Sequence, residues 1–186
     1  MRSVTKILNR VFPMDKSIPE WILERARVRG TTVHEWVEQY NKYLNDGGEI
    51  PIIDLEYLIY ADGYKKWIED YEVKIKHAEL YLVSKDEKIC GVVDIICSTK
   101  DDDEVVVDLK LTSVPDIPYV ELQTSAYKYL CLDNEVVHPT CKQKLLHLSK
   151  NGYNYIDLED KQDLFKELIK VDEYLCSKEK KKKNDE

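Results

Sequence analysis

The sequence lacks any long apolar run, and no stretch approaches the roughly 18 uncharged apolar residues that a membrane span needs. It also lacks an internal repeat and a linker rich in Gly, Ser or Pro, with only 6 glycines and 6 prolines among 186 residues. These absences predict one domain of ordinary size and no membrane association.

Paired cysteine motifs are missing as well. The 5 cysteines, an odd number, include no C-x-x-C pair, and their spacings do not suit zinc or an iron–sulfur cluster. Free, mostly buried thiols in a reducing cytoplasm are therefore expected. Residues 1–14 carry three basic side chains and no acid, which fits a first helix of the domain or, alternatively, a mitochondrial transit peptide.

The sequence also lacks an excess of positive charge. Lys and Arg number 28 against 36 Asp and Glu, a formal charge of −8, which argues against a protein held on nucleic acid by bulk basic charge. The acidic excess lies after residue 48, because residues 1–48 hold 8 Lys and Arg against 6 Asp and Glu and are slightly basic. The Lys-rich residues 177–186 are expected to be a flexible tail, either a frayed helix end or an arm that contacts phosphates.

The first third of the chain has a helical pattern. Residues 1–71 are predicted to hold a short first helix, then a helix after a Ser17-x-x-Glu20 capping signal. A separate helix is expected from Thr31 or Thr32 to Leu44, ended by Asp46-Gly47-Gly48, and another over residues 53–71.

The remainder alternates between strand and helix patterns. Three β-rich runs separated by polar turns predict an antiparallel meander over residues 72–83, 88–98 and 104–111. A helix over 119–131, a hairpin turning at Asn151-Gly152 and a final helix over 161–176 follow. The fold class is therefore α/β (α+β), a single domain of residues 1–176 with a central mixed sheet flanked by helices.

Two acidic side chains are expected to meet in the meander. Asp94 lies on its second run, and Asp108 and Lys110 lie on one face of the third. If these runs pair as a hairpin, Asp94 and Asp108 come together, and two adjacent carboxylates require a cation between them. Such ligands suit Mg²⁺ or Mn²⁺. With a lysine beside them, they predict metal-dependent phosphodiester hydrolysis.

These residues carry a family resemblance. The runs Gly91-Val92-Val93-Asp94 and Val105–Lys110 resemble the core of the PD-(D/E)XK nuclease superfamily, most of all its RecB-type exonuclease branch with phage-encoded members. Further motifs of that branch occur in the same order, over residues 2 to about 170: G-x-x-x-H at Gly30–His34, an acid at Glu79, and Q-x-x-x-Y at Gln123–Tyr127.

One departure from the family pattern concerns the residues after the lysine. The family's D-x-K-T is here Asp108-Leu109-Lys110-Leu111, so the first hydroxyl comes one place later, at Thr112. The roles of Thr112 and Ser113 therefore stay open.

The resemblance implies a site. The metal, Mg²⁺ with Mn²⁺ as a substitute, would be held by His34, Asp94, Asp108, the carbonyl of Leu109, and Glu79 directly or through water. Lys110 would be the catalytic lysine, and Gln123 and Tyr127 would support the site or contact a phosphate. Arg25 and Arg29, which share a helix face upstream of His34, either pair with neighbouring acids or form a phosphate-contacting rim.

The implied activity is that of a deoxyribonuclease, an exonuclease in recombination, repair or phage DNA processing, in the cytoplasm of a bacterial or phage-infected cell. The alternatives are a structure- or site-selective endonuclease of the same fold and a non-catalytic DNA-binding subunit of a recombination complex. The resemblance also allows a homo-oligomer and a recombination or single-strand-annealing partner protein. Because bulk charge is unfavourable, weak DNA binding is expected without divalent metal.

Overall fold

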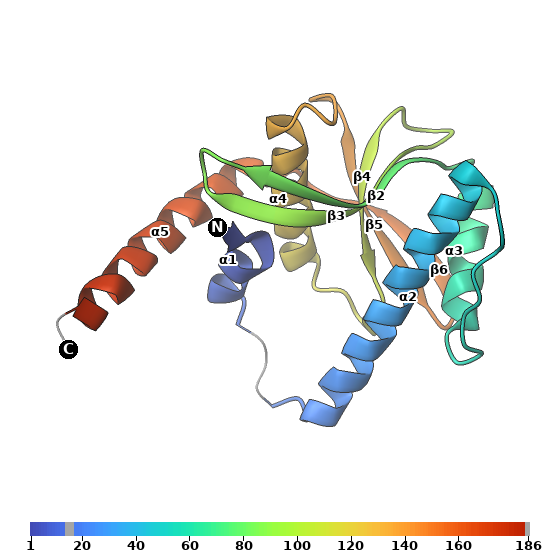
Figure 1. The fold of residues 1–186 in the computed structure, drawn as a ribbon, viewed down its shortest axis with the longest axis horizontal. Coiled ribbons are helices and arrows are strands. Elements are labelled where there is room, and N and C mark those ends of the chain that lie inside the picture. Colours follow the sequence, from blue (N-terminus) through green and yellow to red (C-terminus); the bar gives the residue numbers. More distant parts are fainter. Residues whose placement is uncertain (14–16, 185–186) are drawn as a thin grey trace.

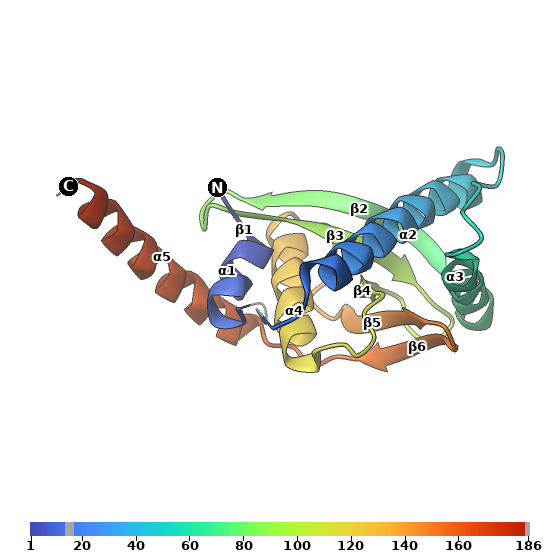
Figure 2. The same cartoon turned by 90° about the horizontal axis from the view of Figure 1, so that it is seen from below.

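The fold is a mixed β-sheet with helices on both faces (Figures 1 and 2). A computed structural model describes residues 1–13 and 17–184. For residues 179–184 it describes the backbone alone. Within the part of the chain that is described there are five helices and six strands. After the short first strand they follow the predicted order of helices, strands, helix, strands and helix. None of the helices in the described ranges combines the length and the apolar character needed to cross a bilayer.

The predicted meander is confirmed and forms the centre of the sheet. Strand β2 (Lys74–Ser84) pairs antiparallel with β3 (Ile89–Ser98), which pairs antiparallel with β4 (Val105–Lys110). Because β2 occupies one edge of β3 along its length, the other edge is shared by two strands. The two-residue β1 (Arg2–Ser3) pairs in parallel with the start of β3, and β4 pairs with its end.

The second hairpin is also confirmed, with its turn displaced by one residue. Strand β5 (Lys142–Ser149) pairs in parallel with β4, and β6 (Gly152–Asp157) pairs antiparallel with β5. Ser149 lies opposite Gly152, so the turn is Lys150-Asn151 rather than Asn151-Gly152. The reason is that the positive φ, 102°, falls on the glycine, which adopts it without a steric cost.

Helices cover the two faces of the sheet with separate apolar cores. Helices α1 (Val4–Val11), α4 (Ile117–Asp133) and α5 (Gln162–Asn184) pack on one face, around Leu8, Leu130 and Phe165. Helices α2 (Glu20–Asp46) and α3 (Leu58–Tyr71) pack on the other, around Trp36, Tyr64 and Trp67. Side chains from β3 and β4 contribute to both cores, so these strands are enclosed from both sides.

The N-terminal third is helical, but its divisions differ from those predicted. Helix α2 is a single helix of 27 residues where two were expected, because Gly30 stays within the helix instead of ending it. The helix begins at Glu20, after Pro19, and so two residues later than the Ser17 capping signal predicts. The φ of Pro19, −57°, already suits entry into a helix.

The structure differs from the sequence prediction at two other places in this third of the chain. Helix α3 begins at Leu58 instead of residue 53, because Tyr57 N–H donates to the Asp54 carbonyl (2.8 Å) in a turn before it. Strand β1 was not predicted, since two residues carry no periodicity.

The last helix extends past its predicted end. Helix α5 continues to Asn184, beyond residue 176, so the backbone of most of the expected tail is helical. Near its middle, Asp172 is 3% exposed and lies 2.6 Å from both Arg2 Nη1 and Arg10 Nε. This buried charge triad, the Asp172 clamp, joins β1 and α1 to α5.

The close approach of α4 to β3 depends on Gly91. A Cβ at this position would lie 2.9 Å from Tyr127 Cε1 and 3.1 Å from Leu130 Cδ1. Gly91→Ala is therefore expected to lower the free energy of unfolding by about 1–3 kcal/mol, because the buried ring must shift. Urea denaturation measures this loss.

Gly30→Ala is the matched control, because a Cβ there meets nothing within 4 Å and the position is helical. It is expected to stabilise the protein by about 0.5–1 kcal/mol. A Gly91→Ala variant as stable as the wild type would contradict the observed packing of α4 on β3.

Candidate functional site

The sheet is irregular where the candidate residues lie. Pairing of β2 with β3 passes from Ala78↔Ile95 to Leu80↔Val93 and omits Glu79 and Asp94 between them. Glu79 has a φ of 47°, a left-handed conformation that costs a residue with a Cβ about 1–2 kcal/mol. Backbone outliers of this kind concentrate at functional sites, because the surrounding structure must hold them there.

Three predicted residues converge at this irregularity. His34 from α2, Glu79 from β2 and Asp94 from β3 each place one ligand atom within 4.8 Å of the others. His34 Nδ1 lies 3.0 Å from Glu79 Oε1. These two residues also border a hollow of 410 Å³ beside α2, so the cluster is reached from solvent. One imidazole and two carboxylates form a donor set that suits divalent metals.

Asp108 and Lys110 lie beside this cluster on β4. Asp108 is 1% exposed, and its Oδ2 lies 2.7 Å from Lys110 Nζ. Its Oδ1 is buried and has no hydrogen-bond partner among the described residues. Asp94 comes directly before Ile95 on β3 and Asp108 directly after Val107 on β4, and Ile95 and Val107 are the pair at which the ladder between these two strands ends. The structure thus brings the two strands' carboxylates to one place, as the sequence predicted.

A backbone hydrogen bond fixes the Asp94 side chain across the gap between the two strands. Leu109 N–H donates to Asp94 Oδ2 at 2.7 Å, while the Leu109 side chain is buried in the core. The role of its carbonyl as a ligand stays a prediction.

Asp94 and Asp108 are harder to ionise than ordinary aspartates. Burial raises the pKa of Asp108 to about 6; the Lys110 charge opposes this shift and the Asp94 charge adds to it. Burial also raises the pKa of Asp94, although His34 and Lys110 oppose the shift.

The pKa values of the two basic groups of the site are raised. Burial lowers the pKa of His34, but its hydrogen bond to Glu79 and the Asp94 charge outweigh this and raise it. Burial likewise lowers the pKa of Lys110, and the charges of Asp108 and Asp94 raise it further than burial lowers it. The raised pKa values of His34 and Lys110 reflect the negative charge beside them, whereas those of Asp94 and Asp108 come first from burial. The imidazole and carboxylate donors, with the unpartnered Asp108 Oδ1 beside them, fit a divalent metal ion.

Helix α4 closes the site from the other face of the sheet. Gln123 Nε2 donates to Tyr127 Oη at 2.9 Å, and Gln123 Oε1 is buried with no partner among the described residues. Burial, together with the charges of Asp94 and Asp108, raises the pKa of Tyr127 well above its ordinary value. Gln123 and Tyr127 thus lie near the site, and their role in supporting it or in contacting a phosphate stays a prediction.

Sequence reasoning missed Tyr119, at the start of α4. Burial raises the pKa of Tyr119; the Lys110 charge opposes the shift and the Asp108 charge adds to it, so its hydroxyl lies near both groups. Tyr119, Gln123 and Tyr127 follow one another at intervals of four residues on one helix face. That spacing was the available signal.

The structure places the two predicted arginines outside the metal cluster. They line a hollow of 660 Å³ on another side of α2. Arg25 lies 3.9 Å from Glu56, with both side chains mostly exposed, and Arg29 Cζ lies 6.0 Å from the Tyr60 ring centre. Contact with phosphates stays a prediction for both.

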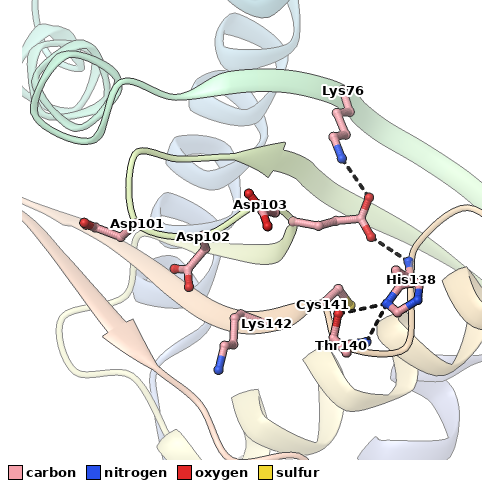
Figure 3. Close-up of a pocket in the computed structure, with 9 residues that line it drawn as sticks. Lys76, Asp101, Asp102, Asp103, His138, Thr140, Cys141 and Lys142 are labelled. Atoms are coloured by element: carbon pink, nitrogen blue, oxygen red, sulfur yellow. Dashed lines mark hydrogen bonds and ion pairs between the residues drawn. The ribbon is translucent and has the colours of Figure 1, made fainter.

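A second acidic hollow, of 470 Å³, lies at the turn between β3 and β4 and contains Asp101, Asp102 and Asp103 (Figure 3). Glu104 there accepts hydrogen bonds from Lys76 Nζ at 2.8 Å and from His138 N–H at 2.6 Å, and Asp102 pairs with Lys144 at 3.1 Å. Lysines thus pair with Glu104 and Asp102, and Asp101 and Asp103 are exposed to solvent, so we do not include this hollow in the candidate site.

Comparison with known proteins leaves the family open. No protein-family model matches the chain. Over 95 residues, 51% of the chain, it is 28% identical to the bifunctional protein PyrR of Clostridium beijerinckii (strain ATCC 51743 / NCIMB 8052), and it spans about half of that protein (52%). The crystal structure of SSO0001 matches with a TM-score of 0.40 and 14% identity, over 92% of this chain and 83% of that one. The function must therefore be argued from the site.

The raised pKa of Asp108 gives a testable dependence of stability on pH. Between its ordinary value of 3.8 and about 6, the folded state binds more protons than the unfolded state, so stability falls as pH rises through this window. Asp108→Asn cannot ionise and is expected to gain about 1–3 kcal/mol over the wild type in EDTA at pH 8, with little gain near pH 4. Thermal melts across this range measure it.

Asp101→Asn is the control, because Asp101 is an exposed carboxylate on the turn between β3 and β4. It is expected to leave the melting temperature unchanged. The charge analysis of the site is wrong if Asp108→Asn melts below the wild type at pH 8.

Proposed function

We propose that the protein is a metal-dependent nuclease that hydrolyses phosphodiester bonds in DNA. The observation that carries the proposal is the buried Asp108, in contact with Lys110 at 2.7 Å and next to the convergent His34, Glu79 and Asp94. Buried charges at this density are costly and are kept where chemistry needs them. The resemblance of the same residues to the PD-(D/E)XK nucleases supports this reaction over others.

The ligands to a divalent cation would be His34, Glu79, Asp94 and Asp108, with Mg²⁺ or Mn²⁺ the ions that suit them. When bound, such an ion supplies Lewis-acid polarisation of a phosphoryl oxygen and lowers the pKa of water. The chain's own contribution is to fix these ligands: Leu109 N–H holds Asp94, and Glu79 orients His34.

Lys110 acts as a fixed cation. Because its pKa is raised, its ammonium stays protonated at neutral pH, and it stabilises the negative charge that develops on the phosphate oxygens. Burial raises the pKa values of Tyr119 and Tyr127, so their hydroxyls keep their protons and serve as hydrogen-bond donors. The unpartnered Gln123 Oε1 is a free acceptor at the same helix face.

Exonucleolytic cleavage is the form of the activity that the RecB-type resemblance favours. A site-selective endonuclease of the same fold would use the same residues. A non-catalytic DNA-binding subunit would have no need of Lys110 and every acid together, so the complete set favours an enzyme.

Cleavage is expected to require Mg²⁺ and to depend on two side chains. Asp108→Ala and Lys110→Ala should each lower the rate of loss of end-labelled linear DNA by about 100-fold or more, since each removes charge from the reacting centre. Lys142→Ala, an exposed lysine on β5, is the matched control and should cleave like the wild type. Full activity in both site variants would disprove the site assignment.

Two further measurements separate the alternatives. Covalently closed circular DNA should survive under conditions that degrade the linear form, and nicking of the circle would instead indicate an endonuclease. Calorimetry should show binding of Mn²⁺ that is lost in Asp108→Ala. Absence of both metal binding and cleavage in the wild type would favour the non-catalytic module.

A further inference from the structure

The hollow beside the first turns of α2 has a mixed lining. It lies between α2, the chain just before and at the start of α3, and the loop that follows β4. Figure 1 shows the start of α2 projecting past the sheet, near the connection from β4 to α4. We call this hollow the α2 groove; its lining includes Trp21, Arg25, Arg29, Tyr57, Thr112 and Lys150.

An apolar helix face is left uncovered in the groove. Farther along α2, Val33 and Trp36 are buried against the sheet core. At its start, where the helix has passed the sheet, Trp21 is 63% exposed and Ile18 and Ile22 are also exposed. Neighbouring large apolar side chains that are exposed together and bordered by polar residues indicate a contact surface.

Positive charge gathers in the same groove, against the negative charge of the whole chain. Arg25, Arg29 and Lys150 line it with Glu56 as the single acid among the lining residues of the described chain. The Arg25–Glu56 contact is long, at 3.9 Å, and exposed, so it holds Arg25 only weakly. Arg29 Nε has no hydrogen-bond partner among the described residues. The groove thus offers cations to an anionic ligand.

Both walls of the groove are close in sequence to residues of the candidate metal centre. Arg29 precedes His34 by five residues on α2, and Thr112 and Ser113 follow Lys110 after one intervening residue, Leu111. His147 Nε2 donates to the Thr112 carbonyl at 2.7 Å, which anchors this loop. Thr112 and Ser113, whose roles the sequence left open, therefore line the groove.

From these observations we propose that the α2 groove binds a single strand of nucleic acid and leads it to the metal centre. Unpaired bases stack on exposed aromatic rings while arginine and lysine contact the phosphates, and this pairing of surfaces is what the groove provides. A duplex presents mainly its phosphates and would leave Trp21 and the isoleucines without a partner. The proposal rests on the proposed nuclease function and names the strand form that the nuclease takes.

Tryptophan fluorescence reports directly on the groove. Of the three tryptophans, Trp36 and Trp67 are buried and Trp21 is exposed. In EDTA, where no cleavage is expected, an oligothymidylate of about 12 nucleotides should quench the emission of the full chain at low salt. A duplex of the same length should quench it much less.

Variants separate stacking from general charge. Binding of labelled oligothymidylate, followed by anisotropy, should weaken about tenfold in Trp21→Ala and be largely kept in Trp21→Phe. Tyr174→Ala is the aromatic control, because Tyr174 is 60% exposed on α5, away from the groove.

Two arginine variants test whether the position of the charge matters. Arg25→Ala should weaken binding, whereas Arg27→Ala should not, because Arg27 pairs with Glu20 and Glu24 outside the groove lining. Equal losses in these two variants would indicate bulk charge and overturn the proposal.

Three further results would overturn the assignment of the α2 groove, and one kinetic result would support it. Equal affinity for the duplex, an unchanged affinity in Trp21→Ala, or burial of Trp21 by self-association of the chain would each overturn the groove assignment. In Mg²⁺, a raised KM with a nearly unchanged kcat in Trp21→Ala would support it. Quenching and the variant pattern without any cleavage would leave the groove in place and reject only the nuclease proposal.

Discussion

Two carboxylates, Asp94 and Asp108, are held side by side in the interior, and much of the architecture compensates for them. Burial of each is unfavourable, as the raised pKa values of both show. Lys110 and Leu109 N–H offset part of this cost on β4, and His34 reaches in from α2. The interrupted ladder between β2 and β3 and the left-handed Glu79 lie at the same place in the sheet. Strain and buried charge of this kind lower stability in return for a site.

The parts of this arrangement that the sequence could predict are the local ones. The meander follows from its β-rich runs and the polar turns between them, and the meeting of Asp94 with Asp108 follows from the length of one hairpin. His34 and Glu79 were reachable only through the family resemblance, because no spacing rule connects a helix at residue 34 to a strand at residue 79. Gly30 resembles a helix breaker in the sequence, yet it lies inside α2 with space around it, which only the tertiary structure shows. The α2 groove was also out of reach, because it exists only where a helix passes beyond the sheet and faces a loop more than 80 residues later.

Helix α2 has two roles along its length. Its C-terminal half buries Val33, Trp36 and Val37 against the sheet and is fixed there. Its N-terminal half leaves the sheet and keeps its apolar and basic side chains exposed. His34 lies in the fixed half, so the candidate ligand stays in place while the adjoining turns remain open to a ligand. One continuous helix thus connects a rigid site to an open surface, which two separate helices, as first predicted, would not do.

The Asp172 clamp has a consequence for how the chain unfolds. Arg2 and Arg10 reach the same buried carboxylate of α5, so β1, α1 and the middle of α5 share one electrostatic anchor. Detachment of β1 and α1 would leave the buried Asp172 without both arginines, and detachment of α5 would leave the arginines without Asp172, which is strongly unfavourable. These segments, at opposite ends of the sequence, are therefore expected to open and close as one cooperative unit. Their amide protons should exchange with solvent at closely similar free energies, in a step distinct from the opening of the β2–β3–β4 meander.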